Sequence, residues 1–332
     1  MSIADARWFA VDLHVPDRRF GMLALDEALI ERASFLDTRL EAPLAQASAL
    51  PVADVARASV AQAPVAWLFH TSFCASTLLA RALHLAPNTV CLKEPLVLRR
   101  LADARKSGWP LDGLVDTSVK LLGRPWHPGG AVVIKPTHVA LNVAQALLAA
   151  TPHSRAIVLT SSLDDFMVSN IKKEPASQAK IPTLVDRALR ATTFRARLPA
   201  IALEPPDLIA ASGLQWAAQR ELVADVVDAV GASRIRVLDM HAMLRDFAAC
   251  VVRCADWLEL AIPHHGLARH AADTITRNAK ALDVSYGAEQ RARDASAIAG
   301  QFRPALGRAR AWLDRHVLPA MRPIARDEPS AW

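Results

Sequence analysis

The residues with the clearest capacity for chemistry follow an apolar run that has the character of a buried strand. After Val65–His70 comes a loop of small residues, and a helix is expected to begin at Ser76 and Thr77. A loop of this kind presents backbone N–H groups, and the helix dipole adds positive potential, so the arrangement suits a phosphate or a sulfate. The loop contains neither glycine nor lysine and therefore differs from the Walker A pattern GxxxxGK(S/T).

Polar residues also end the later apolar runs. Lys93 and Glu94 follow the second run, Lys135 ends the third, and Ser161 follows the fourth. The carboxyl ends of parallel strands meet at one edge of a sheet, and ligands bind there. We therefore expect hydroxyl groups, two lysines and one carboxylate to gather at this edge, a combination that suits group transfer from an anionic donor. The lysines stand out because most basic residues of this chain are arginines.

Each of these residues also has an ordinary structural explanation. Ser76 and Thr77 are favoured caps of a helix that binds nothing. Glu94 is either a carboxylate stabilised by a helix start or a general base toward an acceptor hydroxyl. Lys135 either extends to solvent or points into the site, where its charge would stabilise a departing oxygen. Cys74 is either a nucleophile activated by the helix or a small residue that fills the loop.

Strand-like and helix-like segments alternate along the middle of the chain. The runs expected to form strands are Val65–His70, Thr89–Leu92, Ala131–Lys135, Arg155–Thr160 and Arg234–Leu238. Helical patterns fall at Ser76–Leu85, Pro95–Lys106, Asp112–Leu122, His138–Ala150, Leu163–Lys173, Thr183–Arg197, Pro206–Val230 and Glu289–Met321. This alternation predicts an α/β fold in which helices cover both faces of a central parallel sheet, giving three α/β/α layers.

The N-terminal residues lack this alternation. We predict that residues 1–64 form a helical cap and a linker, with one helix at Asp26–Ala33 and an Ala/Ser/Pro-rich connection at residues 47–64. Residues 65–332 are predicted to form the α/β domain together with its C-terminal helices.

Composition and charge exclude several classes of protein. Of the 332 residues, 52% are hydrophobic and 22% are charged, which is normal for a globular protein with a sizeable core. The net charge of +6 permits an anionic ligand, but no block of like charges indicates nucleic-acid binding and no long apolar run indicates a membrane span. The four cysteines and the lack of a signal-peptide pattern favour a cytoplasmic location. No group of cysteines and histidines has the spacing of a metal site.

The loop sequence SFCASTLLARAL resembles the 5′-phosphosulfate loop of bacterial sulfotransferases and tyrosylprotein sulfotransferases, which runs like PRSGSTLL. Ser76–Leu79 match that pattern directly. Ala75 stands where the family has glycine, Cys74 where it has serine, and Phe73 where it has a basic residue. The resemblance implies a cofactor-binding loop that consists of Ser72, Phe73, Cys74, Ala75, Ser76 and Thr77.

Two further segments follow in the order of that family. Cys91–Leu98, CLKEPLVL, resembles the segment in which tyrosylprotein sulfotransferases carry an acidic catalytic base, and Glu94 is the matching residue. Val132–Pro136, VVIKP, resembles the family strand that ends in a lysine, and Lys135 is the matching residue. The resemblance therefore implies that Glu94 and Lys135 are the catalytic residues.

The contacts expected for the 3′-phosphate lie farther along the chain. Arg155–Lys173 resembles the family strand that is followed by RNPxDxxxS; here Asp165 falls on the aspartate, Ser169 on the serine and Ser161 on the arginine. The segment TRNAKALDVSY resembles the C-terminal basic segment near the cofactor, with Lys280 as its cation. The resemblance implies that Ser161, Ser169 and Lys280 also bind the cofactor.

The resemblance covers about residues 60–290 and implies a divergent sulfotransferase with a P-loop-like fold. The implied donor is 3′-phosphoadenylyl sulfate, and no metal is expected. The acceptor would be a hydroxyl or an amine of a small molecule or a peptide, which the sequence does not identify. Residues 175–230 are expected to wall the acceptor pocket.

Departures from the family pattern keep two other functions open. Phe73 and Ser161 replace expected cations, so either Lys93, Lys135 or Lys280 supplies the charge at the loop, or the chain is a non-catalytic nucleotide-binding protein of the same fold.

The other alternative is a nucleotide-dependent small-molecule kinase. Such an enzyme needs a loop lysine and an acid that binds Mg²⁺. The loop lysine is absent, whereas Asp164 and Asp165 follow a predicted strand and could supply the acid.

Overall fold

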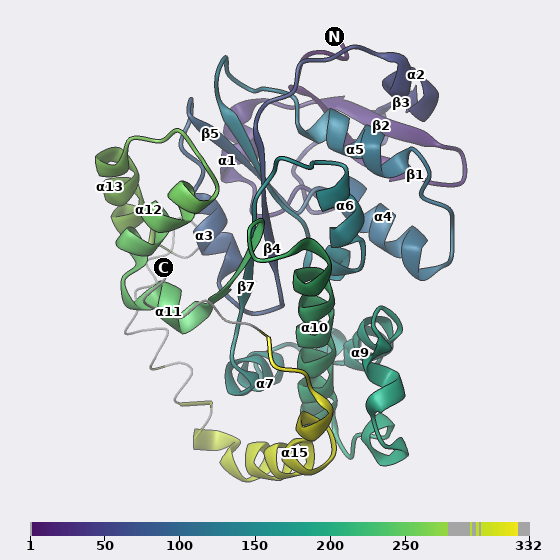
Figure 1. The fold of residues 1–332 in the computed structure, drawn as a ribbon, viewed down its shortest axis with the longest axis vertical. Coiled ribbons are helices and arrows are strands. Elements are labelled where there is room, and N and C mark those ends of the chain that lie inside the picture. The colour runs from purple at the N-terminus through teal and green to yellow at the C-terminus, as the bar shows by residue number, and fades with distance from the viewer. Residues whose placement is uncertain (1, 278–292, 294–296, 299, 325–332) are drawn as a thin grey trace.

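A five-stranded parallel sheet forms the centre of the chain (Figure 1). The computed structural model describes residues 2–277, 293, 297–298 and 300–324. In spatial order the strands are β5 (Thr89–Lys93), β6 (Ala131–Lys135), β4 (Val65–His70), β7 (Ala156–Thr160) and β8 (Ile235–Asp239). All neighbouring pairs are parallel, so the carboxyl ends of the strands share one edge. The α/β fold class is confirmed, and each predicted strand is present to within one residue at either end.

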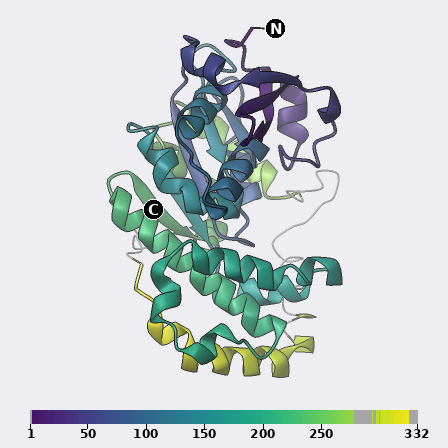
Figure 2. The ribbon, with the colours of Figure 1, turned by 90° about the vertical axis from the view of Figure 1, so that its right-hand side faces the viewer.

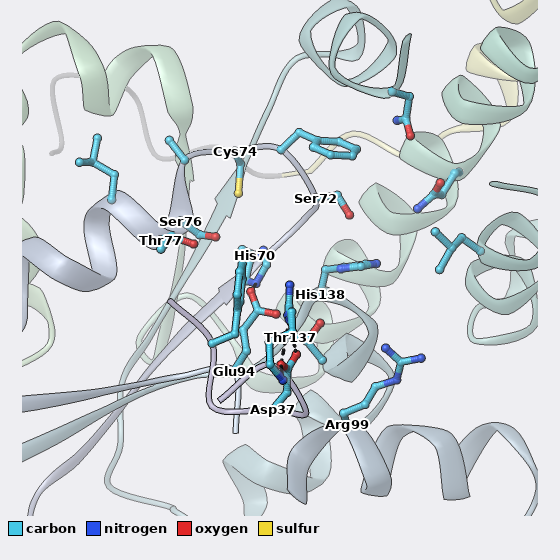
Figure 3. Close-up of a pocket in the computed structure, with 18 residues that line it drawn as sticks. Asp37, His70, Ser72, Cys74, Ser76, Thr77, Glu94, Arg99, Thr137 and His138 are labelled. Atoms are coloured by element: carbon cyan, nitrogen blue, oxygen red, sulfur yellow. Dashed lines mark hydrogen bonds and ion pairs between the residues drawn. The ribbon is translucent and has the colours of Figure 1, made fainter. Parts of the chain in front are cut away.

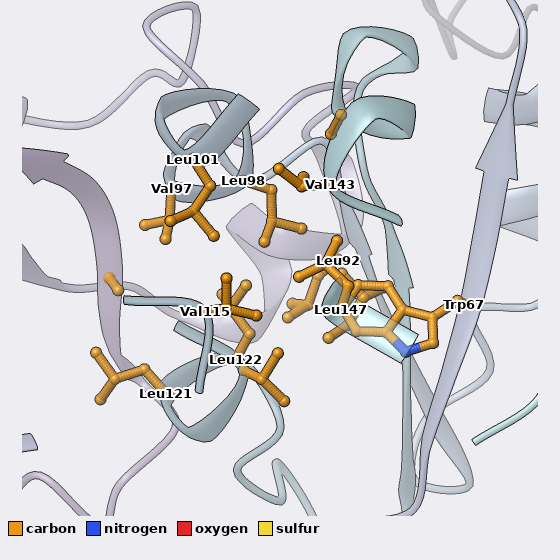
Figure 4. Close-up of a cluster of buried hydrophobic side chains, with 14 of the residues drawn as sticks. Trp67, Leu92, Val97, Leu98, Leu101, Val115, Leu121, Leu122, Val143 and Leu147 are labelled. Carbon is orange, nitrogen blue, oxygen red and sulfur yellow. The ribbon is translucent and has the colours of Figure 1, made fainter. Parts of the chain in front are cut away.

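Helices cover one face of the sheet and enclose a large apolar core (Figure 4). They are α4 (Leu96–Lys106), α5 (Leu114–Leu122), the 3-10 helix η2 (His138–Val143), α6 (Ala144–Ala149) and part of α10 (Leu208–Val230). Trp67 of β4 and Leu92 of β5 lie in one buried cluster with Leu98 of α4, Leu122 of α5 and Leu147 of α6. This core packs these helices against one face of the sheet.

A second set of helices covers the opposite face. It consists of α3 (Ser76–Ala82), α11 (Met240–Arg245), α12 (Phe247–Trp257) and α13 (His264–Thr274). Cys91 and Val133 belong to this second core, so both faces of the sheet are buried and its strands are continuous apolar runs. The predicted helical segments did not include α11, α12 or α13; α11 buries only Met243 and α13 only Leu267 and Ala271, whereas α12 buries five residues and was missed despite them.

A helical lobe with its own apolar core adjoins the carboxyl edge of the sheet, where α7 leaves β7 (Figure 2). Its elements are α7 (Leu163–Ile171), α8 (Pro175–Gln178), α9 (Ile181–Arg190), η3 (Thr193–Arg197), η4 (Ala200–Leu203), α10, α15 (Arg303–His316) and η5 (Leu318–Ala320). Helices α10 and α15 approach so closely that a Cβ atom at Gly213 would lie 2.2 Å from Leu313 Cδ1. Among the described residues, no helix has both the length and the apolarity that crossing a membrane requires.

The N-terminal residues differ from the predicted helical cap. They form a three-stranded antiparallel sheet of β1 (Trp8–His14), β2 (Arg19–Ala24) and β3 (Ser48–Pro51), together with α1 (Glu27–Arg32), η1 (Leu44–Gln46) and α2 (Val52–Arg57). Phe9, Ala10, Val11 and Leu13 of β1 are buried, and a register shift beside Ala10 interrupts the period of two that marks a strand. Arg18, at φ +51°, closes the turn to β2. Helix α1 matches the helix predicted at Asp26–Ala33, and the boundary at residue 64 stays a prediction.

A buried arginine fastens the start of the chain to the α/β domain. Arg124 is fully buried just beyond α5. Its guanidinium donates hydrogen bonds to the carbonyl oxygens of Ile3, Asp5 and Trp8, each at 2.8 Å. The first strand is therefore held in place by a side chain from the domain that it covers.

Helix α1 is fastened near the carboxyl edge of the sheet in a similar way. Lys93 Nζ donates to the carbonyl oxygen of Ile30 at 2.8 Å, and Arg81 Nη1 donates to that of Glu31 at 2.9 Å. The Leu36 N–H then donates to the carbonyl oxygen of Lys93 at 2.7 Å. These bonds bring the segment after α1 to the strand ends.

Candidate active site

Strand ends bring polar side chains together on the side of the sheet that α3 covers. Strand β4 ends at His70, β5 at Lys93 and β6 at Lys135. Lys93 and Lys135 are partners in the parallel register of β5 and β6, so their side chains leave the same face of the sheet. Figure 3 shows Glu94, His70 and His138 gathered on one side of an open space, with the loop that follows β4 on the other.

The space between them is a cavity of about 460 Å³. Small-molecule sites typically have volumes of ~300–1,000 Å³, so the cavity is large enough for a ligand of ordinary size. Its walls come from five parts of the chain: the segment after α1, the β4–α3 loop, the strand ends, the helices α4 and η2, and the helical lobe. Lining residues from these parts include Asp37, Arg39, Ser72, Ser76, Thr77, Glu94, Arg99, His138, Asn170 and Gln215.

Glu94 and Lys135 form an ion pair at one wall of this cavity. Lys135 Nζ lies 2.5 Å from Glu94 Oε1; the lysine side chain is fully buried and the glutamate side chain is 12% exposed. Glu94 has φ +57°, a conformation that costs a non-glycine residue about 1–3 kcal/mol and persists only where its surroundings enforce it. Here the Glu94 N–H donates to the Lys135 carbonyl oxygen at 2.7 Å. Lys135 therefore holds both the backbone and the side chain of Glu94.

The surroundings keep Glu94 ionised. Burial by itself would raise the pKa of Glu94, but the charge and hydrogen bond of Lys135 outweigh it and lower the pKa to about 2. A carboxylate with so low a pKa accepts a proton poorly while the pair is intact. An anionic ligand that drew Lys135 away would remove this stabilisation and raise the pKa of Glu94.

Two buried histidines beside the pair are neutral at physiological pH. Burial, assisted by the charge of Lys135, lowers the pKa of His70 to about 3, and burial lowers the pKa of His138 to about 4. His70 Nδ1 lies 2.8 Å from the Thr71 carbonyl oxygen, so the neutral ring donates there and leaves Nε2 as an acceptor. That Nε2 lies 3.7 Å from Glu94 Oε1 and has no hydrogen-bond partner among the described residues.

The β4–α3 loop follows a left-handed path without glycine. Phe73 and Ala75 both have φ +59°, a region that glycine adopts at no steric cost. The sulfotransferase loop pattern PRSGSTLL has glycine at the position of Ala75. The left-handed conformation at this position explains why glycine suits it. The Ser72 N–H donates to Gln219 Oε1 at 3.1 Å, and α10 thereby holds the loop.

The helix that follows the loop places two hydroxyl groups at the cavity. Ser76 and Thr77 line it and are 6% exposed each, and α3 begins with no side-chain cap from Ala75. Cys74 lines the cavity as well, but its Sγ donates to the Thr71 carbonyl oxygen at 3.0 Å. Burial raises the pKa of Cys74 to about 11, which leaves the thiol protonated and unsuited to act as a nucleophile.

The lysines expected to supply charge at the loop lie in different places. Lys135 pairs with Glu94 beside the cavity, whereas Lys93 points to α1. Lys280 lies outside the described residues. Lys173, which the sequence did not single out, places its Nζ 5.3 Å from the centroid of the Phe73 ring. The ammonium group of Lys173 therefore lies next to Phe73, the residue that stands where the family pattern has a basic residue.

The residues expected at the 3′-phosphate are partly placed. Ser161 is buried and its hydroxyl donates to the Ser72 carbonyl oxygen at 3.2 Å, so it supports the loop. Ser169 is half-buried on α7, and its neighbour Asn170 lines the cavity. Lys280 lies outside the described residues. Contacts from Ser161, Ser169 and Lys280 to a donor stay predictions.

Several lining residues were not identified from the sequence. Asp37 and Arg39 belong to the segment after α1; Arg39 Nε donates to Asp37 Oδ1 at 2.8 Å, and Arg39 Cζ lies 3.5 Å from the Phe35 ring centroid. No motif marks this segment. Gln215 lines the cavity and Gln219 holds the loop, both from α10. Residues four apart lie on the same face of a helix, so the two glutamines in this apolar segment could have predicted a polar patch on a buried face.

The acids considered for a kinase lie away from the cavity. The Asp164 side chain is 71% exposed and pairs with Arg310 at 3.3 Å, and Asp165 Oδ2 lies 2.6 Å from His241 Nε2. Neither of them lines the cavity. Within the described ranges, no group of three or more histidine, cysteine, aspartate or glutamate side chains is arranged to hold a metal ion.

Comparisons with known proteins give a likeness of fold. No family model matches the chain, and no curated protein sequence matches it. A sulfotransferase from Alicyclobacillus acidocaldarius is similar with a TM-score of 0.40 and 14% identity, over 79% of this chain and 100% of that one. The sulfotransferase domain from the curacin biosynthetic pathway has a TM-score of 0.38 and 10% identity, over 73% and 99% of the two chains. The sulfotransferase domain from the Synechococcus PCC 7002 olefin synthase has a TM-score of 0.38 and 11% identity, over 73% of this chain and 96% of that one. Likeness at this level carries no inference about activity, which has to come from the site.

Proposed function

We propose that the chain is a sulfotransferase-like enzyme that transfers a sulfuryl group from 3′-phosphoadenylyl sulfate to a hydroxyl or an amine of an acceptor. One observation carries the proposal: Glu94, which is ion-paired with the fully buried Lys135, lines the same cavity of about 460 Å³ as the β4–α3 loop. Transfer of an anionic group needs a proton acceptor and a positive charge near the departing oxygen, and this pair offers both. The motif order noted in the sequence supports the same assignment.

The described residues fit an anionic donor. The loop side chains Ser72, Ser76 and Thr77 line the cavity, and Lys135 supplies a fully buried ammonium group beside it. When bound, the donor supplies the sulfuryl group and a phosphate that departs. Residues 72–77 would hold the phosphosulfate end, and Lys135 would neutralise it.

Lys135 would serve both halves of the reaction. In the structure it neutralises Glu94. An anionic donor competes for the ammonium group, and the pKa of Glu94 then rises toward its ordinary value. Glu94 accepts the proton of the acceptor as the acceptor oxygen or nitrogen bonds to sulfur. The bond between sulfur and the phosphate oxygen breaks, and Lys135 stabilises the electron pair left on that oxygen.

Transfer of radiolabelled sulfate from the donor to a panel of phenols, hydroxy acids and amines tests the proposal. We expect Glu94→Gln to lower kcat by about 10²–10⁴-fold and Lys135→Met by about 10²–10³-fold. Glu259→Gln is a matched control, because Glu259 also has φ +57° but pairs with Arg155 at the surface. This control should keep the wild-type rate.

Other results would point elsewhere. ATP turnover that a chelator abolishes would favour the kinase alternative. Stabilisation by 3′-phosphoadenosine 5′-phosphate, without transfer to any acceptor, would favour a non-catalytic nucleotide-binding protein. A Glu94→Gln variant with the wild-type kcat would remove Glu94 as the base.

A further inference from the structure

Arg187 carries a free hydrogen-bonding edge in the interior of the protein. The residue lies on α9 and is 8% exposed. Its Nη1 pairs with Asp103, but Nε and Nη2 are buried and have no hydrogen-bond partner among the described residues. Nε–H and Nη2–H lie on one edge of the planar guanidinium and form the fork that binds both oxygens of a carboxylate.

The surroundings of Arg187 have a surplus of positive charge. Asp103 also accepts from Arg99 Nε, at 3.0 and 3.1 Å, so one carboxylate serves two guanidinium groups. The nearby charges of Lys135 and Glu94 compensate each other. Burial lowers the pKa of Arg187, although Asp103 partly restores it. A buried charge with incomplete compensation is costly, so an anion within reach of the free edge would be stabilised.

Arg187 also lines a small space, the passage, that adjoins the active-site cavity. This passage, of about 20 Å³, shares His138, Leu184 and Gln215 with the cavity that contains Glu94. On its other side it shares Asn142, Arg187, Ala191 and Leu222 with a second cavity of about 630 Å³. Arg99, which shares Asp103 with Arg187, lines the first cavity. Arg187 is therefore separated from the cavity at Glu94 by this small space, which a carboxylate enters only if the side chains around it move apart.

Unpaired acceptor atoms accompany the unpaired guanidinium edge. Gln215 Oε1 and Asn142 Oδ1 line the passage and have no hydrogen-bond partner within the described ranges. A passage of this volume holds about one water molecule, which would satisfy some of these atoms but not the surplus charge. A ligand with an oxyanion and an O–H or N–H donor would satisfy both kinds of atom.

We propose that the acceptor is a carboxylic acid that also bears a hydroxyl or an amine, and that its carboxylate binds the Nε–Nη2 edge of Arg187. The other end of the molecule then faces Glu94, which receives the proton. This inference rests on the proposed function, because that function makes the cavity beside Glu94 the acceptor site. It also assigns Arg187 as the residue that selects the acceptor.

Calorimetric titration in the presence of 3′-phosphoadenosine 5′-phosphate tests the inference. The probes are straight-chain ω-hydroxy acids of increasing length, each compared with its methyl ester and with the corresponding hydroxyalkyl phosphate. At the best-fitting length, the wild-type protein should bind the acid about ten- to hundredfold more tightly than the ester. Arg187→Met should remove this preference. Arg195→Met, which changes an exposed arginine of the same lobe, should keep it.

A second variant keeps the inference testable if Arg187→Met fails to fold. Leu184→Trp narrows the entrance to the passage without altering Arg187, and it should also remove the preference for the acid. Equal binding of acid and ester by the wild-type protein would overturn the inference, as would an undiminished preference in Arg187→Met or tighter binding of the phosphates. Arg187-dependent binding without sulfuryl transfer would instead refute the proposed function alone. Transfer to alcohols with no preference for acids would refute the inference alone.

Discussion

Three residues with left-handed backbones surround the cavity. Phe73, Ala75 and Glu94 all have φ between +57° and +59°, and all three line it. The cost of such conformations is offset by the bonds around them, such as the hydrogen bond from the Glu94 N–H to Lys135. A loop without glycine can therefore still take the path of a glycine-containing loop.

The conformation of Ala75 makes a stability prediction. Ala75→Gly should raise the free energy of unfolding by up to about 1 kcal/mol, because glycine removes the steric cost of φ +59°, offset in part by the greater entropy of the unfolded chain. Urea titration measures the change. Ala80→Gly, at a fully buried position inside the helix α3 that follows Ala75, should lower the free energy of unfolding by at least about 1 kcal/mol. If both variants lost stability equally, the left-handed assignment of Ala75 would be wrong.

Residue types alone predicted part of the site. Glu94 and Lys135 were identifiable because a carboxylate and a rare lysine stood at the ends of apolar runs, and the structure pairs them at 2.5 Å. The direction of Lys93 was not identifiable, because the carbonyl oxygens of α1 that it binds come from a segment about sixty positions earlier. A lysine at a strand end therefore did not by itself distinguish a residue of the candidate site from one that positions another element.

At the scale of elements, the docking of α1 builds one wall of the cavity. Lys93 binds the carbonyl oxygens of Ile30 and Glu31, and the chain then passes Asp37 and Arg39 along the opening. The role of Lys93 is therefore to position an element. Lys135, its partner across the strand pair, touches the proposed base instead.

This division of roles predicts different effects for two lysines. Lys93→Met should lower the free energy of unfolding by about 1–3 kcal/mol, because it removes the buried donor to the Ile30 carbonyl oxygen, whereas the Glu31 carbonyl oxygen keeps its bond from Arg81. Its affinity for 3′-phosphoadenosine 5′-phosphate should stay within about twofold of the wild-type value. Urea titration and calorimetry measure these quantities. A large loss of affinity at unchanged stability would place Lys93 in the binding site.

The elements that the sequence predicted best are those buried on two sides. Strands β4 to β8 are continuous apolar runs, because helices cover both faces of the sheet. Strand β1 has a register shift between Ala10 and Asp12, which weakens its alternation. Helix α13 buries only Leu267 and Ala271, which is too few apolar positions to mark a helix in the sequence.

At the scale of the whole molecule, buried neutral histidines tie stability to pH. His70, His84 and His138 have pKa values of about 3, 3 and 4, against 6.5 for an ordinary histidine. Below pH 6.5 the unfolded chain gains a proton at each of them and the folded protein does not. The free energy of unfolding should therefore fall by about 1.4 kcal/mol per pH unit for each histidine as the pH decreases toward about 4.

Glu94 should add a further loss in stronger acid. Its pKa of about 2 lies below the ordinary value of 4.5, so the stability it contributes above pH 4.5 disappears as the pH falls toward 2. Urea titrations across the acid range measure both effects.

His138→Gln should reduce the slope of the free energy of unfolding against pH, between pH 6 and 5, by about one third, whereas His153→Gln, at an exposed position, should leave this slope unchanged. An unaltered slope in His138→Gln would contradict the neutral state of His138.

The cavity itself is a property of the whole molecule. Its walls combine a segment near residue 37, a loop near residue 73, strand ends near residues 94 and 135, and α10 near residue 215. The strand ends were predictable, because parallel strands place their carboxyl ends at one edge. The contributions of Arg39 and Gln215 were not, because they depend on how α1 and the helical lobe dock.

Calorimetric titration with 3′-phosphoadenosine 5′-phosphate tests the central claim most directly, because it needs no acceptor. We predict saturable binding at one site of the wild-type protein, weakened at least about tenfold by Lys135→Met and unchanged by Glu259→Gln. No saturable binding by the wild-type protein, or an affinity that does not depend on Lys135, would contradict the assignment of this site to a sulfuryl donor.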